Sequence, residues 1–295
     1  MDHSENLNSE MDVSTILKTG QLNYEKIFTD HKGLIAHKWV HYFYIYDRLF
    51  SEYREKNKPL TIMEIGVDRG GSMEIWKKYF PDGSKIHGVD INPECKEISF
   101  TENIHFHLGS ASDRNFMENT FKDIEFDIIL DDGSHICSDV IETFKIMFPK
   151  LKNGGLYVVE DLHTSYWPNY GGGKKKGTSS IEYFKNFVEA LNVDYICPNI
   201  VRVAKRLNLN FINKAMSILE KNVYRQYSNG IDFPKFIESI TFYDSICAIK
   251  KYSSPKNNPF KSIITGDKNF NGVNCCKNEL EFIQSVKNIF GTENS

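Results

Sequence analysis

The stretch PLTIMEIGVDRGGSMEIWKKYF (59–80) joins an apolar run to an amphipathic run through a glycine-rich turn. Its first half predicts a buried strand, and its second half suits a helix that begins at Ser72, a favoured N-cap residue. Gly66, Gly70 and Gly71 let the backbone turn tightly and let a ligand approach it closely. The stretch therefore predicts a strand–loop–helix unit of an open α/β sheet.

Further strands and helices surround this unit. Strands are predicted over the runs KIHGVDI (85–91), IHFHLGS (104–110), FDIILDD (126–132) and GLYVVED (155–161). Helices are predicted over the aromatic segment 38–53 and over VIETFKIMFPKL (140–151), and ESITFYDSICAIKK (238–251) predicts an antiparallel hairpin at the sheet edge. Because strands alternate with helices, the fold class is α/β with a doubly wound, mostly parallel sheet.

Pattern and composition suggest one main domain with additions at both ends. We expect an N-terminal helical segment over 1–57, the main domain over 58–253 with an insert at about 166–235, and a weakly patterned tail over 254–295. The segment around Ile16–Leu22 is amphipathic. Segment 176–235 has no assigned role.

Composition excludes several classes of protein. Of the 295 residues 40% are hydrophobic and 25% charged, and the net charge of −3 gives no reason to expect a nucleic acid polymer or an anionic membrane as partner. No apolar run approaches the roughly 18 residues of a membrane span. The N-terminus lacks the features of a signal peptide, so a cytoplasmic location is expected. The six cysteines show no CxxC spacing, which predicts reduced thiols.

The first glycine loop and the second strand indicate an adenosine-containing cofactor. Glu64, Gly66 and Gly70 form a Glu-x-Gly-x-x-x-Gly pattern, which differs from the Gly-x-Gly-x-x-Gly of dinucleotide-binding folds. Asp90 lies at the end of the second strand, where a carboxylate can accept hydrogen bonds from both hydroxyls of a ribose.

Acidic residues follow two predicted strands that should be neighbours. DDGSH (131–135) follows the fourth strand and EDLHTSYWP (160–168) the fifth. Asp132, Glu160 and Asp161 then converge, and carboxylates brought together repel one another unless a cation lies among them. An all-oxygen set suits Mg²⁺ better than Zn²⁺.

These motifs resemble those of the class I S-adenosylmethionine-dependent methyltransferases. Over about residues 30–175 they are similar to the metal-dependent sugar O-methyltransferases of the macrocin and mycinamicin type. The similarity lies in MEIGVDRGGSMEIWKKYFP, IHGVDINP, FDIILDDGSH and GGLYVVEDLHTSYWPNYGG. The resemblance implies a seven-stranded Rossmann-like sheet with an antiparallel last strand, with S-adenosylmethionine and Mg²⁺ as cofactors.

The resemblance also implies site residues. Cofactor-binding residues are expected to be Glu64, Gly66, Gly70, Ser72, Asp90, Ser110 and Asp131. Metal ligands are expected to be Asp132, Glu160 and Asp161. A divalent ion that chelates two vicinal sugar hydroxyls acidifies both, and a nearby histidine can accept the released proton near neutral pH. His135 is the expected general base, with His163 and Asp131 as the alternatives.

The loop after the fifth strand is the expected acceptor region. Tyr166, Trp167, Lys174 and Lys175 are its candidate binding residues, and the lysines of NYGGGKKKGTSS (169–180) suit a diphosphate. A merely solvated loop is the alternative interpretation.

The predicted reaction is methylation of a nucleotide-linked hexose or heptose for surface (capsular) polysaccharide. The alternative is an O-methyltransferase of a catechol-like or glycosylated small molecule. Further alternatives are an NAD-dependent oxidoreductase and a non-catalytic binding protein on a similar sheet. A homo-oligomer is left open.

Overall fold

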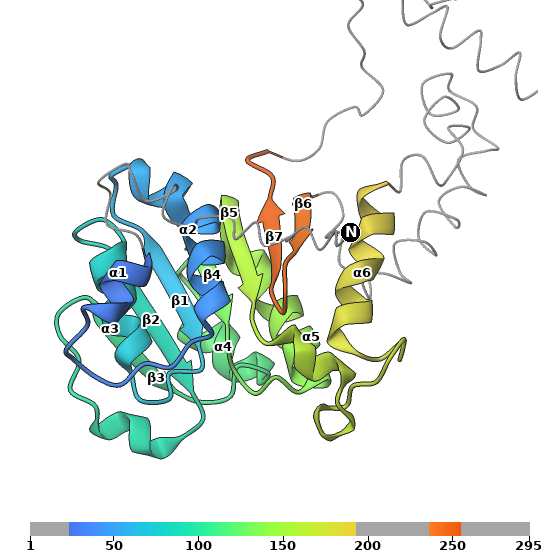
Figure 1. The fold of residues 1–295 in the computed structure, drawn as a ribbon, viewed down its shortest axis with the longest axis horizontal. Coiled ribbons are helices and arrows are strands. Elements are labelled where there is room, and N and C mark those ends of the chain that lie inside the picture. The colour runs from blue at the N-terminus through green and yellow to red at the C-terminus, as the bar shows by residue number, and fades with distance from the viewer. Residues whose placement is uncertain (1–23, 193–235, 255–295) are drawn as a thin grey trace, which may run out of the picture.

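A seven-stranded sheet forms the centre of the computed structural model, which describes residues 24–192 and 236–254 (Figure 1). The strand order is β3-β2-β1-β4-β5-β7-β6. Neighbours from β3 to β5 pair in parallel, and β7 pairs antiparallel with both β5 and β6. The strands are β1 (Thr61–Ile65), β2 (Lys85–Asp90), β3 (Ile104–Leu108), β4 (Phe126–Asp131), β5 (Leu151–Val159), β6 (Ile237–Phe242) and β7 (Cys247–Lys251). The predicted doubly wound, mostly parallel sheet with an edge hairpin is confirmed.

Helices cover both faces of the sheet (Figure 1). The α-helices are α1 (Tyr24–Thr29), α2 (Val40–Glu55), α3 (Gly71–Tyr79), α4 (Arg114–Thr120), α5 (Cys137–Met147) and α6 (Ser180–Leu191). Short 3-10 helices are η2 (Pro93–Glu97), η3 (Phe148–Lys150), η4 (Leu162–Tyr166) and η5 (Pro168–Tyr170). No described helix has the length and apolar composition needed to cross a bilayer.

Two hydrophobic cores follow from the alternation of side chains along the strands. On β1, Ile62 joins the core that contains Trp76 and the aromatic face of α2, whereas Met63 joins the core that contains Phe144 and Phe184. Helices α1–α3 therefore cover one face of the sheet and α4–α6 the other. The sheet is held between them with its carboxyl strand ends open to the loops.

Two predicted boundaries were wrong. Helix α3 begins at Gly71 with Gly70 as its N-cap at φ +83°, and the Ser72 hydroxyl donates to the Glu64 carboxylate at 2.7 Å instead of capping the helix. The predicted helix 140–151 ends too late, because Leu151 already pairs with Phe126 in the sheet.

Several predicted features lie outside the described residues. These are the segment around Ile16–Leu22, most of the insert and the tail after residue 254.

Candidate active site

Gly66 brings the loop after β1 against the loop after β4. Its φ is +91°, and a Cβ atom there would lie 2.1 Å from the carbonyl oxygen of Asp132. Its N–H donates to the Val89 carbonyl at 2.8 Å, and the Asp132 N–H donates to the Ile65 carbonyl at 2.9 Å. Only glycine fits both the backbone conformation and this approach. The carboxyl ends of three neighbouring strands are thereby held together.

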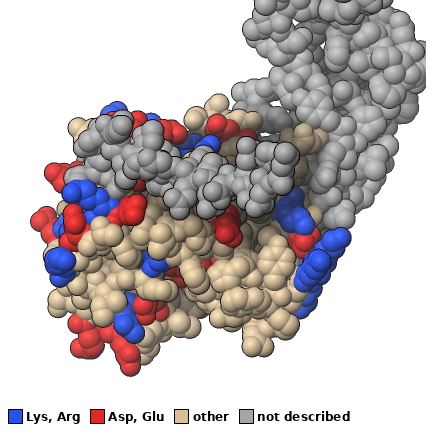
Figure 2. Space-filling view, in the orientation of Figure 1, with Lys and Arg blue, Asp and Glu red and all other residues tan. Residues whose placement is uncertain are grey.

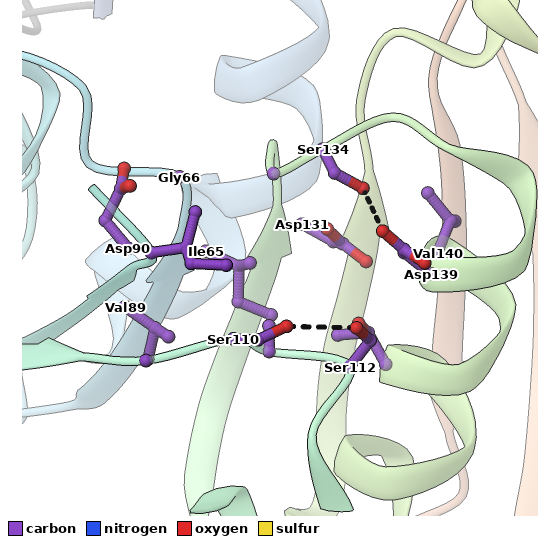
Figure 3. A pocket seen from close by; sticks show the side chains of 15 residues that line it. Ile65, Gly66, Val89, Asp90, Ser110, Ser112, Asp131, Ser134, Asp139 and Val140 are labelled. Carbon is purple, nitrogen blue, oxygen red and sulfur yellow. Dashed lines mark hydrogen bonds between the residues drawn. The ribbon is translucent and has the colours of Figure 1, made fainter. Parts of the chain in front are cut away.

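A first cavity of about 210 Å³ opens at these strand ends (Figure 3). Three of the predicted cofactor residues line it with their side chains: Asp90, Ser110 and Asp131. Its apolar lining includes Val89, Val140 and Ile91, of which Ile91 is 72% exposed. An uncovered apolar side chain between hydroxyls and carboxylates suits a ligand with a flat apolar ring and polar edges.

Asp90 is already occupied by backbone hydrogen bonds. Its Oδ2 accepts from the N–H groups of Val67 at 2.8 Å and Asp68 at 3.0 Å, and its Oδ1 accepts from the Asn92 N–H at 2.8 Å. A carboxylate offers about four acceptor positions, so about one remains for a ligand hydroxyl. Asp90 therefore shapes the glycine loop as well as facing the cavity.

Adjacent acidic residues at the end of β4 face different cavities. Asp131 is 3% exposed, accepts a hydrogen bond from the Tyr157 hydroxyl at 3.2 Å and lines the first cavity. Burial raises the pKa of Asp131 to about 7. Asp132 lines a second cavity instead. The structure thus separates Asp131 from the side chains that surround His135.

Glu64, Gly70 and Ser72 support the glycine loop. Glu64 is fully buried and accepts hydrogen bonds from the Ser72 hydroxyl and, at 3.2 Å, from the Trp76 indole N–H. Burial raises the pKa of Glu64 to about 7. Ser72 lines the second cavity, whereas Glu64 and Gly70 line neither of the two. Glu64 therefore ties α3 to β1.

The second cavity, of about 480 Å³, adjoins the first. It lies between residues 35–39 and the loops after β1, β4 and β5, and it shares Gly66, Asp90 and Gly133 with the first cavity. Its lining includes Asp132, His135, Glu160 and Asp161. The predicted cofactor side and the predicted metal side therefore meet at the glycine loop.

Asp132, His135 and Asp161 can hold a cation. Their ligand atoms lie within 4.8 Å of one another, and His135 Nε2 is 3.9 Å from Asp132 Oδ1 and 3.7 Å from Asp161 Oδ2. Each side chain is 21% exposed. His135 and Asp161 have left-handed backbones, at φ +58° and +53°. Such conformations often mark functional positions. The two carboxylates suit a hard divalent ion, and the imidazole beside them can accept a proton.

Glu160 has different partners from its neighbour Asp161. It is 2% exposed, and its Oε1 accepts a hydrogen bond from the Tyr46 hydroxyl at 2.6 Å. Its Oε2 accepts from the Lys38 ammonium at 2.9 Å. Burial and the adjacent Asp132 charge raise the pKa of Glu160. Both Glu160 oxygens are therefore engaged by protein donors.

Lys38 is a site residue that the sequence analysis missed. Its side chain is 4% exposed, and its ammonium also contacts Asp132 Oδ2 and lies 3.8 Å from Glu64 Oε1. Burial lowers the pKa of Lys38, but the Asp132, Glu160 and Glu64 charges more than offset this, so the pKa lies well above its usual value. We call Glu64, Asp132 and Glu160 the acidic cluster, and Lys38 neutralises part of its charge.

The sequence analysis also missed Tyr42 and Tyr46 of α2 as site residues. The Tyr42 hydroxyl donates to Asp161 Oδ1 at 2.6 Å, as Tyr46 does to Glu160. Tyr42 and Tyr46 are spaced by four within α2, which places their hydroxyls along one face of the helix, and Lys38 precedes that helix. That spacing was the available signal, but the aromatic segment suggested only packing.

The predicted acceptor residues and His163 lie beside this site. His163 Nδ1 is 2.6 Å from the Ser245 hydroxyl oxygen and 3.9 Å from Asp161 Oδ1. The His163 ring contacts the rings of Trp39, at 6.1 Å between centroids, and Trp167, at 4.9 Å. We call Trp39, His163 and Trp167 the aromatic cluster. Trp39 and Trp167 are each 49% exposed, so their rings remain available to a ligand.

Tyr166 is 48% exposed, and Lys174 and Lys175 are exposed in the loop that follows. Figure 2 shows basic side chains gathered at the edge of the molecule where this loop leads into α6. The structure therefore leaves the predicted acceptor residues accessible.

A comparison of the sequence with protein families finds a match over the part of the chain that runs from β1 to β5. Residues 63–162 match the family model described as a methyltransferase domain. Over these residues the chain is similar to a methyltransferase domain. This domain spans β1 to the start of η4 and contains the glycine loop, Asp90, the DDGSH motif and Asp161. The family match favours the methyltransferase prediction over the NAD-dependent oxidoreductase.

Two curated relatives come from Streptomyces olivaceus and Micromonospora griseorubida. The "8-demethyl-8-(2-methoxy-alpha-L-rhamnosyl)-tetracenomycin-C 3'-O-methyltransferase" of Streptomyces olivaceus is 32% identical over 198 residues, which cover 60% of this chain and 50% of that protein. The "Mycinamicin VI 2''-O-methyltransferase" of Micromonospora griseorubida is 33% identical over 193 residues, which cover 57% and 47%. The chain spans about half the length of the curated relatives it matches.

A solved structure shares the fold of the methyltransferase domain. It is the MycE methyltransferase from the mycinamycin biosynthetic pathway in complex with Mg and SAH, with a TM-score of 0.57 and 26% identity. The match covers 73% of this chain and 50% of that chain. The predicted Rossmann-like methyltransferase fold is thereby confirmed.

Proposed function

We propose that this protein transfers a methyl group from S-adenosylmethionine to a sugar hydroxyl in a Mg²⁺-dependent reaction. The observation that carries the proposal is the junction of the two cavities at Gly66, Asp90 and Gly133. A nucleoside in the first cavity would direct its sulfonium arm toward the second, where Asp132, His135 and Asp161 gather. The relatives whose names describe O-methyltransferases of sugar-bearing compounds support the acceptor class.

The side chains of the second cavity account for the chemistry. A bound Mg²⁺ supplies a Lewis acid that acidifies and orients substrate hydroxyls. Asp132, Asp161 and Glu160 are the residues that would hold it, with Glu160 available only after Lys38 releases its oxygen. His135 Nε2 accepts the hydroxyl proton, and the carboxylates 3.7–3.9 Å away stabilise the resulting imidazolium. Positioning supplies much of the remainder, since a sulfonium is already reactive.

The acceptor proposal has a coarse and a fine form. In the coarse form, the acceptor is a sugar carried on a larger molecule. The exposed rings of the aromatic cluster suit the apolar face of such a sugar. The fine form is a nucleotide-linked hexose or heptose for surface polysaccharide. The exposed side chains of Lys174, Lys175 and Lys176 support the fine form, because they follow Trp167 in the chain and a diphosphate binds cations.

The test of the proposed function is methyl transfer to a panel of acceptors. We would incubate the protein with S-adenosylmethionine, Mg²⁺ and nucleotide-linked sugars, free sugars, glycosylated macrolides or catechols, and detect one added methyl by mass spectrometry. Transfer to a sugar in any form supports the coarse proposal. Equal turnover of free and nucleotide-linked sugars contradicts the fine one, and transfer to catechols alone contradicts both.

Asp90→Asn is expected to weaken binding of S-adenosylhomocysteine by about 2 kcal/mol, measured by calorimetry. The substitution removes the negative charge that a ribose hydroxyl would meet and places an amide N–H₂ against backbone donors. Asp113→Asn is the matched control, because Asp113 also accepts a backbone N–H, from Phe116 at 3.1 Å, but lines neither cavity. Equal affinities of wild type and the Asp90 variant would remove Asp90 from the cofactor site.

Reversing the charge of Lys174, Lys175 and Lys176 to glutamate is expected to raise KM for a nucleotide-linked acceptor by about tenfold or more. Affinity for S-adenosylhomocysteine should not change, because the three lysines line neither cavity. The triple reversal of Lys58, Lys85 and Lys122 to glutamate controls for net charge, since these three residues are exposed and line neither cavity. An unchanged KM would leave these lysines as solvated side chains.

A further inference from the structure

Lys38 holds the oxygens that a three-carboxylate metal site would need. Its ammonium contacts Asp132 Oδ2 and, at 2.9 Å, Glu160 Oε2. The remaining Glu160 oxygen accepts from Tyr46, and Asp161 Oδ1 accepts from Tyr42. This leaves Asp132 Oδ1 and Asp161 Oδ2, the two oxygens that face His135. A cation can use these two at once, but it can use Glu160 only when Lys38 withdraws.

The acidic cluster needs a positive charge whether or not a metal is present. Glu64 and Glu160 are 0% and 2% exposed, and buried carboxylates without a counter-charge are costly. In the part of the chain that the structure describes, the Lys38 ammonium lies within 4 Å of Glu64, Asp132 and Glu160. A divalent ion bound to Asp132 and Glu160 would place its charge beside this ammonium, and the two cations would repel each other.

We propose that Lys38 is a positioning residue that takes the place of the divalent cation in the metal-free protein and competes with that cation for Asp132 and Glu160. This inference rests on the proposed function, because that function supplies the cation. Lys38 holds both carboxylates in place, and it leaves them as the cation binds. A cation that uses Glu160 and the Lys38 contact therefore exclude each other, so the Lys38 contact weakens cation binding and cation binding weakens the Lys38 contact.

Displacement of the Lys38 side chain would change the segment of residues 35–39, which forms one wall of the second cavity. Ile35, Ala36, His37, Lys38 and Trp39 all line that cavity. The segment is fixed at its start, where the Gly71 N–H donates to the Ile35 carbonyl at 3.2 Å, and at its end by the first turn of α2. Its middle is held to the acidic cluster by Lys38. Release of that side chain changes the cavity wall that carries Trp39, so cation loading is linked to the acceptor side of the cavity.

Titration with Mn²⁺, followed by the electron paramagnetic resonance signal of the free ion, tests the competition. Lys38→Met is expected to bind Mn²⁺ about tenfold more tightly than wild type or better, because the competing charge is gone. Lys152→Met is the matched control, since Lys152 forms an ion pair with Asp127 at 2.7 Å outside both cavities. Its affinity should equal that of wild type. Equal or weaker Mn²⁺ binding by folded Lys38→Met overturns the proposal.

Hydrogen exchange of the wild-type protein gives a second measurement that does not depend on the variant folding. Backbone amides of residues 36–39 are expected to exchange at least about threefold faster with Mg²⁺ than with the metal removed by EDTA. Unchanged or slower exchange there, in protein that binds Mg²⁺, overturns the proposal while leaving the methyltransferase function standing. Absence of both cation binding and methyl transfer in wild type would instead count against the proposed function.

Discussion

His135→Ala is expected to lower kcat for methyl transfer by a factor of roughly 10²–10⁴, the usual contribution of a general base. His135 Nε2 is the titratable nitrogen that lies within 4 Å of both Asp132 and Asp161. Those carboxylates would stabilise its protonated form and would also flank the acceptor hydroxyl. Binding of S-adenosylhomocysteine should be unaffected, because His135 does not line the first cavity.

Single-turnover kinetics at saturating cofactor measure this loss directly. His163→Ala is the comparison variant, because His163 also lies near Asp161 but its Nδ1 is engaged by Ser245 at 2.6 Å. We expect His163→Ala to change KM for the acceptor through the aromatic cluster more than it changes kcat. If His135→Ala kept full activity while His163→Ala lost it, the base would be His163.

Gly66→Ala is expected to destabilise the protein by on the order of 3 kcal/mol and to abolish measurable binding of S-adenosylhomocysteine. A methyl group at this position would meet the Asp132 carbonyl at 2.1 Å, and a left-handed backbone at φ +91° disfavours any Cβ. The loop after β1 would have to move away from the loop after β4, which separates the walls of both cavities. Chemical denaturation and calorimetry measure the two effects.

Gly177→Ala is the matched control for the same chemical change. A Cβ atom at Gly177 would meet no heavy atom within 4 Å, so its free energy of unfolding should match that of wild type closely. A Gly66→Ala protein with wild-type stability and cofactor affinity would show that the close approach of the two loops is not required.

The order of strands and helices could be predicted because each element carries its own periodicity. The apolar runs that end in Asp90, Asp131 and Glu160 are local signals, and parallel strands necessarily bring their carboxyl ends to one edge of the sheet. For that reason the convergence of Asp132 with Asp161 was predictable once the neighbouring strands were identified. Ser72 shows the limit of local signals, since a favoured N-cap residue donated instead to Glu64.

Local patterns were enough to predict the sheet, the glycine loop and the acidic residues at the strand ends, because these features depend on residues close together in the chain. How the acidic residues divide between the two cavities depends on contacts between distant parts of the chain. Asp131 is the last residue of β4 and accepts a hydrogen bond from Tyr157 of β5, whereas Asp132 begins the following loop and contacts Lys38. Glu160 faces Lys38 and Tyr46, which reach it across 122 and 114 positions of the chain. No local pattern specifies such contacts, since they form only when α2 packs on the sheet and the buried carboxylates require donors.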